Sequence, residues 1–403
     1  MEETLRLGLQ VDPLAVLSFV LYLIIIVGIG ILSTRYSSSG LSEFFLAGRK
    51  LREFVVALSA VVSGRSAWLL VGVTGMAFTI GAPAIWAVTG YITVEVFLFA
   101  FVGKRLRRYT SMMENITLPD FFESRFKDNS NVLRIISVII ILIFMISYVA
   151  SQFLAGGKAF STSFRVSEIS GILLTSLIVL IYTILGGFLA VSLTDMIQAF
   201  FMIFALLILP IIATIHAGGW GEIVNILHDF HPKFLNPFAF SAGGIIGFLG
   251  IGLGSPGNPH ILVRYMSVAD PRRLRRSCVV GTIWNTLMAW GAIFIGLVGR
   301  AFYLKPEALP GGDPENLFPF MAAAHLHPFL VGIITASILA AIMSTADSQL
   351  LVASSGIVRD IYHKILVKGK TVTQKKLVLL SRIVVLCLVG AALFLGAIAK
   401  EYV

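Results

Sequence analysis

Long apolar runs separated by short polar segments dominate the chain from residue 14 onward. A helix of about 20 apolar residues is long enough to cross a hydrocarbon core about 30 Å thick. The pattern predicts an all-α, polytopic membrane protein embedded in a lipid bilayer. The runs place its ten membrane-spanning helices at residues 14–33, 54–80, 83–102, 133–162, 169–190, 196–216, 243–265, 278–300, 329–356 and 377–399.

Two of these predicted helices carry residues that interrupt an ordinary membrane helix. Residues 57–75, ALSAVVSGRSAWLLVGVTG, place Arg65 about eleven residues into the second helix, near the bilayer midplane. Residues 243–266 hold seven glycines together with Pro256 and Pro259, which remove backbone donors. Irregular backbone at membrane depth persists only inside protein or beside a water-filled cavity. Both helices are therefore predicted to be broken.

The two broken helices are the second and the seventh, so five crossings separate them. An odd number of crossings inserts the two sets of helices in opposite directions. This is the arrangement of transporters built from inverted repeats around a midplane site. The alternative is that glycine-rich helices merely pack closely against their neighbours.

Composition and charge agree with the membrane prediction, because 57% of the residues are hydrophobic and only 13% are charged. The net charge of +10 is compatible with nucleic-acid binding, but its distribution indicates membrane topology instead. With the N-terminus outside, the inside loops 34–53, 103–134, 264–277 and 357–382 carry 23 of the 31 Lys and Arg residues. We expect a multi-pass protein of the plasma (inner) membrane, with its N-terminus outside and no nucleic-acid partner. Within the second loop, residues 118–126 predict a short interfacial helix.

Several stretches carry a family resemblance that covers nearly the whole chain. They are YTILGGFLAVSLTDMIQAFFMIFALLILP (182–210), GLGSPGNPHILVRYMSV (252–268), AAIMSTADSQLLVASSGIVRDIY (340–362), TLPDFFESRF and ALSAVVSGRSAWLL. By these motifs and their order along the chain, the sequence resembles the sodium/solute symporter family, and within it the sodium/proline symporter branch.

The resemblance implies a leucine-transporter-like fold with two inverted five-helix repeats after a leading helix. On this sequence the leading helix and first cytoplasmic loop cover 1–53, and the first repeat covers 54–216. An extracytoplasmic loop covers 217–242, and the second repeat covers 243–403. The last helix of the second repeat is missing from this pattern, so we expect the sequence to be a truncated one.

Polar residues of the ninth predicted helix are the first candidates for ion binding. Ser344, Asp347 and Ser348 are spaced to share one helix face, and Thr345 neighbours them. Hydroxyl oxygens suit a hard cation, although Ser and Thr in membrane helices commonly bond the preceding turn instead. The resemblance implies that Na⁺ is the coupling ion and that Ser344 and Thr345 supply side-chain oxygens to its main site. It also implies that backbone carbonyls complete this site, at Val62, Arg65 and Ala341.

Two aspartates are candidates for a further role. Asp195, in SLTD, matches a family aspartate linked to a further sodium position, and an acid near membrane depth is a functional candidate by default. The alternative is a hydrated carboxylate at the cytoplasmic boundary. Asp347 stands where some members have a neutral polar residue, and it either strengthens a cation site or serves Arg65.

The resemblance also suggests where the solute binds, and where this chain departs from the proline branch. Candidate solute contacts are Arg65, Ser66, Tyr148, Ser255 and Asn258, with Tyr148 matching a family tyrosine at the substrate cavity; a packed membrane aromatic is the alternative for Tyr148. In proline-type members the second helix reads Asp-Met-Ser where this chain has Gly64, Arg65 and Ser66. The seventh helix has Ile251, Ser255 and Pro256 in place of tryptophan, tyrosine and phenylalanine.

Three interpretations of Arg65 remain open at this point. It forms an ion pair with Asp347 or Asp195, because a buried Arg without a partner is costly. It binds a substrate carboxylate, for which its planar fork is suited. Or its charge stands in for a bound cation and so alters ion coupling.

The function predicted from these patterns is Na⁺-coupled import of a small organic solute by alternating access. An amino acid such as proline is the leading substrate, and another small carboxylate with altered ion coupling is the alternative. A second alternative is a symporter-like sensory module without net transport. No nucleophile, metal-ligand set or phosphate loop indicates an enzyme.

Overall fold

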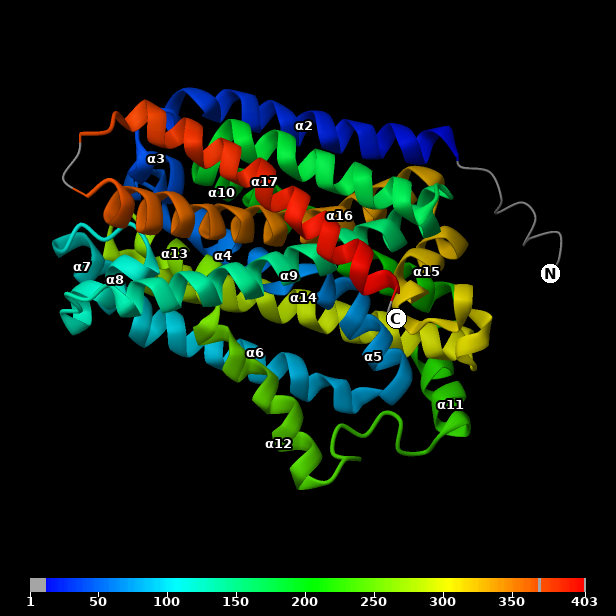
Figure 1. The fold of residues 1–403 in the computed structure, drawn as a ribbon. Coiled ribbons are helices and arrows are strands. Elements are labelled where there is room, and N and C mark those ends of the chain that lie inside the picture. Colours follow the sequence, from blue (N-terminus) through cyan, green and yellow to red (C-terminus); the bar gives the residue numbers. More distant parts are fainter. Residues whose placement is uncertain (1–11, 369–370, 402–403) are drawn as a thin grey trace.

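The computed structural model describes residues 12–368 and 371–401, and these residues form helices joined by short loops (Figure 1). The long helices are α2 (Pro13–Ser37), α9 (Val132–Phe164), α10 (Glu168–His216), α14 (Leu274–Phe302), α16 (Pro328–Ser355) and α17 (Gln374–Glu401). The other α-helices are α3 (Leu41–Leu46), α4 (Glu53–Ala67), α5 (Val73–Ile80), α6 (Ile85–Phe97), α7 (Lys104–Met112), α8 (Leu118–Phe126), α11 (Trp220–Phe230), α12 (Ala242–Gly250), α13 (Pro259–Ser267) and α15 (Leu317–His325). Tighter or wider turns extend several of them, including η2 (Trp68–Gly72), η5 (Ile251–Gly257) and the π-helical η10 (Gly356–Leu366).

The ten spans predicted from the hydrophobic pattern are present. Eight helical segments among the described residues are long and apolar enough to cross a membrane. One of them, α10, has 49 residues and bends at Gly187 into two helices. The run of α12, η5 and α13 supplies a further broken segment. The bend in α10 lies at Gly187, ahead of the boundary predicted near residues 190–196. Three other spans run beyond their predicted bounds, to Ala82–Met112, Pro271–Phe302 and Pro328–Leu366.

Both predicted breaks are also present. In α4, Ser66 has φ 50° and ψ −169°, so the helix stops there and restarts. In the seventh span, 3-10 turns lead to Asn258, which has φ −87° and ψ 96°, and α13 then begins at Pro259. A proline at the first helical position loses no hydrogen bond, because its missing N–H would be unpaired in any case. The chain therefore has interrupted backbone in two helices, as its glycines and prolines predict.

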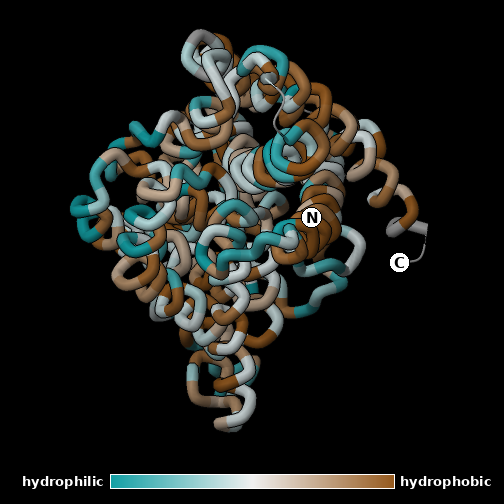
Figure 2. The backbone as a smooth tube through the Cα atoms, turned by 60° about the vertical axis from the view of Figure 1, so that its left-hand side comes forward, coloured by the Kyte–Doolittle hydropathy of each residue, from teal (hydrophilic) through white to brown (hydrophobic). Residues whose placement is uncertain are grey.

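The helices form an inner group surrounded by an outer group. Every residue of α16 from Ile334 to Ser355 is buried, and α16 packs against α2, α4, α9 and α10. By contrast, α2, α9 and α17 expose large apolar side chains such as Ile24, Phe144 and Phe394. Figure 2 shows brown, hydrophobic backbone along much of the helix lengths. Apolar outer surfaces and a partly polar interior are the pattern of a protein solvated by lipid.

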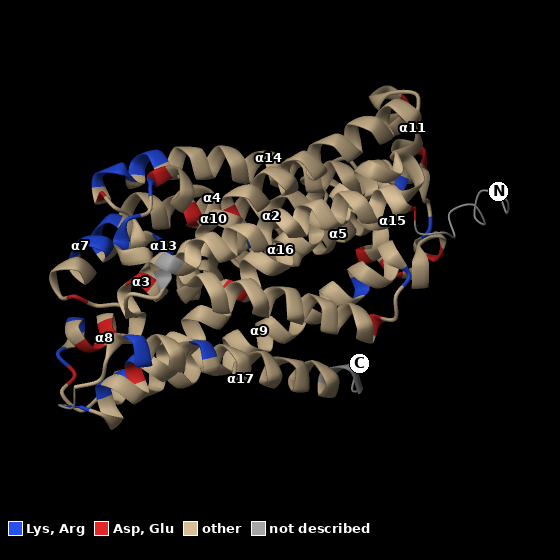
Figure 3. Ribbon diagram, turned by 90° about the horizontal axis from the view of Figure 1, so that it is seen from above, with Lys and Arg blue, Asp and Glu red and all other residues tan. Residues whose placement is uncertain are grey.

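Basic residues gather at one end of the helix bundle, where α3, α7, α8 and α13 meet (Figure 3). The predicted interfacial helix at 118–126 is present there as α8. Two residues assigned to the basic loops lie inside helices with 0% of their surface exposed, Arg134 in α9 and Arg264 in α13.

On the outer side of the bundle, α6 lies close to the end of α12 and to η5. A side-chain carbon on Gly90 would meet the backbone of Leu249 in α12, and one on Gly252 in η5 would meet the backbone of Gly90. This contact holds the first arm of the broken seventh span against α6.

Candidate functional site

The break in α4 releases backbone carbonyls that side chains of neighbouring helices then engage. The N–H of Ala67, which would pair with Ser63 in an unbroken helix, instead donates to the Gln152 amide oxygen at 3.2 Å. The Ser63 carbonyl accepts a bond from the Thr345 hydroxyl at 3.1 Å. The Gly64 carbonyl accepts one from the Tyr91 hydroxyl at 2.7 Å. The interrupted backbone thus joins α4 to α6, α9 and α16.

The hydroxyls predicted to bind sodium converge on this break. Ser344 and Thr345 both donate to the Ala341 carbonyl at 3.1 Å, as helix geometry favours, and Thr345 also reaches Ser63. All four residues have no exposed surface. Two hydroxyl oxygens and two carbonyl oxygens therefore lie together between α16 and α4. The other predicted carbonyl residues, Val62 and Arg65, belong to the last turn before the break, and the Arg65 carbonyl accepts the N–H of Trp68.

A second polar face comes from α9. The Tyr148 hydroxyl donates to the Ser66 hydroxyl at 3.0 Å, and Gln152, one turn later, accepts from Ala67. Two of the predicted solute contacts, Tyr148 and Ser66, are therefore brought together at the break. The two remaining predicted solute contacts outside α4 are Asn258 and Ser255. Asn258 forms the break of the seventh span. The Ser255 hydroxyl is buried without a hydrogen-bond partner among the described residues.

The partners predicted for Arg65 are wrong. Its guanidinium forms an ion pair with Glu95 of α6 at 3.1 Å and donates to the Asn285 side-chain oxygen at 2.5 Å. Asn285 in turn donates to Glu95, and the guanidinium lies 3.7 Å from the centre of the Tyr91 ring. A buried charge is tolerated when it is paired and hydrogen-bonded. Arg65 is thus directed between α6 and α14, away from Asp195 and Asp347, and only its Nη1 is left unbonded.

Asp195 lies within the second half of α10, eight residues beyond Gly187, and has no exposed surface. The alternative of a hydrated carboxylate at the membrane boundary is therefore wrong. Its Oδ2 accepts bonds from Ser59 at 2.6 Å and Ser63 at 3.2 Å, and forms an ion pair with Arg264 at 2.8 Å. Arg264 also donates to Ser59, Ser63 and Ser348 at 2.6, 2.5 and 2.6 Å. This cluster connects α4, α10, α13 and α16.

Asp347 completes the buried polar region. One of its oxygens accepts from the Tyr182 hydroxyl at 2.5 Å and the other from Ser348 at 2.8 Å. Ser348 is shared, because its oxygen also accepts from Arg264. A single guanidinium consequently faces two carboxylates, Asp195 and Asp347, in a region without solvent exposure.

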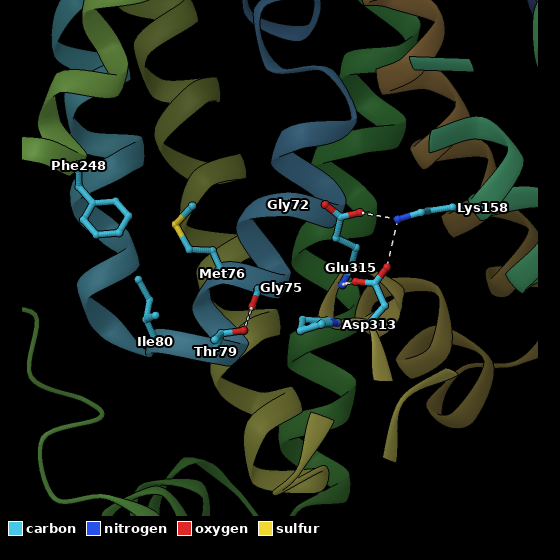
Figure 4. Close-up of a pocket in the computed structure, with 10 residues that line it drawn as sticks. Gly72, Gly75, Met76, Thr79, Ile80, Lys158, Phe248, Asp313 and Glu315 are labelled. Atoms are coloured by element: carbon cyan, nitrogen blue, oxygen red, sulfur yellow. Dashed lines mark hydrogen bonds and ion pairs between the residues drawn. The ribbon is translucent and has the colours of Figure 1, made fainter. Parts of the chain in front are cut away.

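A cavity of about 560 Å³ lies at the end of the bundle opposite the basic loops. Gly72, Gly75, Met76 and Thr79 line it from the segment that follows the break in α4, and Phe248 lines it from α12 (Figure 4). At its rim Lys158 of α9 pairs with Asp313 and Glu315 at 3.1 Å each. The cavity therefore runs along the helix that leads from this end of the molecule to Ser66.

Residues 44–402 match the sequence profile described as the sodium:solute symporter family. The chain belongs to this family. A sodium/proline symporter of Staphylococcus aureus strain JH9 is 39% identical over 372 residues, which cover 91% of this chain and 72% of that protein. The sodium/proline symporter of strain NCTC 8325 matches with the same identity and coverage. The family predicted from the sequence motifs is confirmed, and so is Na⁺ as the coupling ion of a multi-pass symporter.

Solved structures agree on the fold of the symporter. A Na⁺-coupled sialic acid symporter in a substrate-bound, outward-open state has a TM-score of 0.86 at 18% identity and covers 97% of this chain and 83% of its own. Mhp1, a nucleobase-cation-symport-1 family transporter in a closed conformation, has a TM-score of 0.53 at 14% identity, with 89% and 76% covered. The leucine-transporter-like fold expected from the motifs is confirmed. The matched family and both structures are transporters.

Several residues of the symporter's polar interior escaped sequence reasoning. Arg264 was counted with a basic loop, and Glu95 was not predicted as the partner of Arg65. Ser59 and Ser63 are spaced i, i+4 in α4, and the presence of two hydroxyls in an otherwise apolar turn was the available signal. Asn285 and Tyr182 gave no comparable signal, because single polar residues also occur in helices that pack without function.

Proposed function

We propose that this symporter imports a small amino acid together with Na⁺ across the plasma membrane, with proline as the first candidate. The name of the 39% identical relatives supports proline. The cluster of basic residues at one end supports an orientation with that end in the cytoplasm and the N-terminal end of α2 outside. The proposed repeats are residues 54–216 and 243–403, after a leading segment 1–53 and with the loop 217–242 between them.

The observation that carries this proposal is the bond from Thr345 to the Ser63 carbonyl at the break of α4. We assign Na⁺ to the oxygens around it, those of Ser344, Thr345, Ala341, Val62 and Arg65. In the present geometry both hydroxyls direct their protons at carbonyls. A bound Na⁺ would turn the hydroxyl lone pairs inward and replace one hydrogen bond between α4 and α16 by shared coordination. Na⁺ would then hold the two helices in one relative position.

The solute is assigned to the other side of the same break. Ser66 and Tyr148 already meet there, and Ser255 offers an unpaired buried hydroxyl. Asn258 supplies the second interruption and Arg65 an unbonded Nη1. Because Ser63 and Ser66 belong to one turn, ion and solute would act on the same few residues. This adjacency is the physical basis of coupling in the proposal.

A further cation position is assigned to Asp195, Asp347 and Ser348. The shared hydroxyl of Ser348 lies one turn from Ser344 along α16, so the two positions are neighbours. The excess of carboxylates over guanidinium groups in this region favours a cation.

The test is uptake of radiolabelled L-proline by purified protein in liposomes, with an inward Na⁺ gradient, with K⁺ in its place, and with a proton gradient. Na⁺-stimulated accumulation that disappears when an ionophore collapses the gradient supports the proposal. Competition with other amino acids and small carboxylates ranks the substrates. The proposal is contradicted if the uptake rate of every solute tested is the same with and without Na⁺.

A further inference from the structure

Arg264 lies where a bound cation would otherwise be expected, and this carries an inference about coupling that rests on the proposed function. We propose that Arg264 is a tethered cation that competes with Na⁺ for Asp195, and so fixes how many Na⁺ ions accompany each solute.

The contacts of Arg264 are those of an ion held by an oxygen cage. Its guanidinium is surrounded by the Asp195 carboxylate at 2.8 Å and by the hydroxyls of Ser59, Ser63 and Ser348 at 2.5–2.6 Å. Its remaining nitrogen, Nη1, donates to the His260 carbonyl of its own helix. Hydroxyl and carboxylate oxygens are also the ligands that hard cations prefer. A guanidinium and Na⁺ would therefore bind the same oxygens and compete for them.

Arg264 contacts only one of the two carboxylate oxygens of Asp195. Asp195 Oδ2 already takes three donors, while Oδ1 is buried and has no hydrogen-bond partner in the described structure. Asp347, the second carboxylate, bonds only to neutral hydroxyls. One positive charge thus serves two buried acids, and a buried carboxylate without a compensating charge is unfavourable. The region has a place for one more cation, and for two if Arg264 is withdrawn.

The two partners are carried by different interrupted helices. Arg264 follows the break at Asn258 by six residues, and Asp195 follows the bend at Gly187 by eight. While they stay paired, as in the described structure, Arg264 takes one of the two cation places and leaves the other to Na⁺. Na⁺ takes both places only when the guanidinium charge is absent.

The deciding experiment counts Na⁺ ions in Arg264→Gln, which keeps a hydrogen-bonding side chain but removes the charge. In liposomes, the reversal potential of solute flux gives the number of Na⁺ ions per solute. We expect Arg264→Gln to couple one Na⁺ more than the wild type. The double variant Arg264→Gln/Asp195→Asn, with both charges gone, should return to the wild-type number. An unchanged number in Arg264→Gln overturns the proposal.

A merely structural Arg264 would behave differently. Removing one partner of a buried ion pair is strongly destabilising, so Arg264→Gln should melt at a lower temperature in K⁺. Because Na⁺ replaces the lost charge, the melting temperature should rise with added Na⁺ several times more than in the wild type. Loss of stability that Na⁺ does not repair overturns the tethered-cation role. Arg273→Gln is the matched control, since Arg273 is 54% exposed and pairs with Glu53 outside the cage.

Failure of the proposed transport function is separable from failure of this inference. If the wild type shows no Na⁺-driven uptake, binding of ²²Na⁺ to purified protein still counts ions, and Arg264→Gln should bind one more than the wild type. Should Arg264→Gln not fold, Arg264→Lys keeps the charge but loses the fork that spans the cage. Arg264→Lys should then lower the Na⁺ concentration for half-maximal binding at least threefold. A half-saturation concentration equal to that of the wild type would overturn the proposal.

Discussion

The Tyr148 hydroxyl donates a hydrogen bond of 3.0 Å to the hydroxyl of Ser66, the residue at which α4 breaks. The bond joins α9, a long helix with an exposed apolar face, to the interrupted backbone at the centre of the molecule. It places an aromatic hydroxyl where the solute is proposed to bind, a few residues from the proposed Na⁺ ligands.

Replacing Tyr148 by Phe tests this relationship. The ring remains and only the hydroxyl is lost, so the net loss of one hydrogen bond, about 1 kcal/mol, should raise the solute concentration for half-maximal uptake by up to about tenfold. Initial-rate uptake measures it. Ser147→Ala is the control, because that hydroxyl bonds its own helix on an exposed face. A fall in maximal rate with unchanged half-saturation would place Tyr148 outside the solute site.

Thr345 tests the sodium site. Thr345→Ala removes an oxygen that reaches both Ala341 and Ser63, and should raise the Na⁺ concentration for half-maximal uptake more than about tenfold. Thr345→Ser restores the oxygen and should stay within about threefold of wild type. Sodium activation curves at saturating solute give these values. Equal effects of both substitutions would show that the methyl group, through packing, is what matters.

The Arg65–Glu95 pair is expected to be structural. Glu95→Gln leaves the buried guanidinium without its counter-charge and should destabilise the protein by about 3–5 kcal/mol. The double variant Arg65→Met/Glu95→Gln should recover most of this loss. Thermal unfolding of purified protein in detergent ranks the stabilities of the wild type, the single variant and the double variant. By comparison, Lys158→Gln removes a pair 46% exposed on the lysine side and should have little effect. A Glu95→Gln protein as stable as the wild type would contradict the pairing.

Acid sensitivity is expected at the basic end of the molecule. Burial alone would raise the pKa of Asp120, but Arg359 and Arg134, at 3.1 and 2.8 Å, lower it below its ordinary value of 3.8. The charged form therefore stabilises the folded state above pH 3.8, and this contribution disappears as pH falls through the lowered pKa. Asp120→Asn should melt at a lower temperature than wild type at pH 7, and the gap should narrow below pH 4. A gap independent of pH would rule out the charge as its cause.

The sequence allowed much of the fold to be predicted, because the bilayer permits few structures. Apolar length located the helices, and clustered glycine and proline located the breaks at Ser66 and near Asn258. Side-chain partners could not be read in this way. Arg65 pairs with Glu95, 30 residues away, and Arg264 pairs with Asp195, 69 residues away. These contacts depend on which helices are adjacent and how each is rotated, and hydrophobic periodicity does not encode either in a chain whose interior and exterior are both apolar.

The outer arm of the seventh span has a consequence for the cost of motion. None of the residues of α12 is buried, and in Figure 1 it projects from the body of the molecule beside α6. A tilt of α12 about Asn258 would therefore disturb few packed side chains, and surface uncovered within the bilayer would meet lipid, which carries no hydrophobic penalty. The arm is thus held mainly by its close contact with α6 at Gly90, beside the 560 Å³ cavity that Phe248 of α12 also lines.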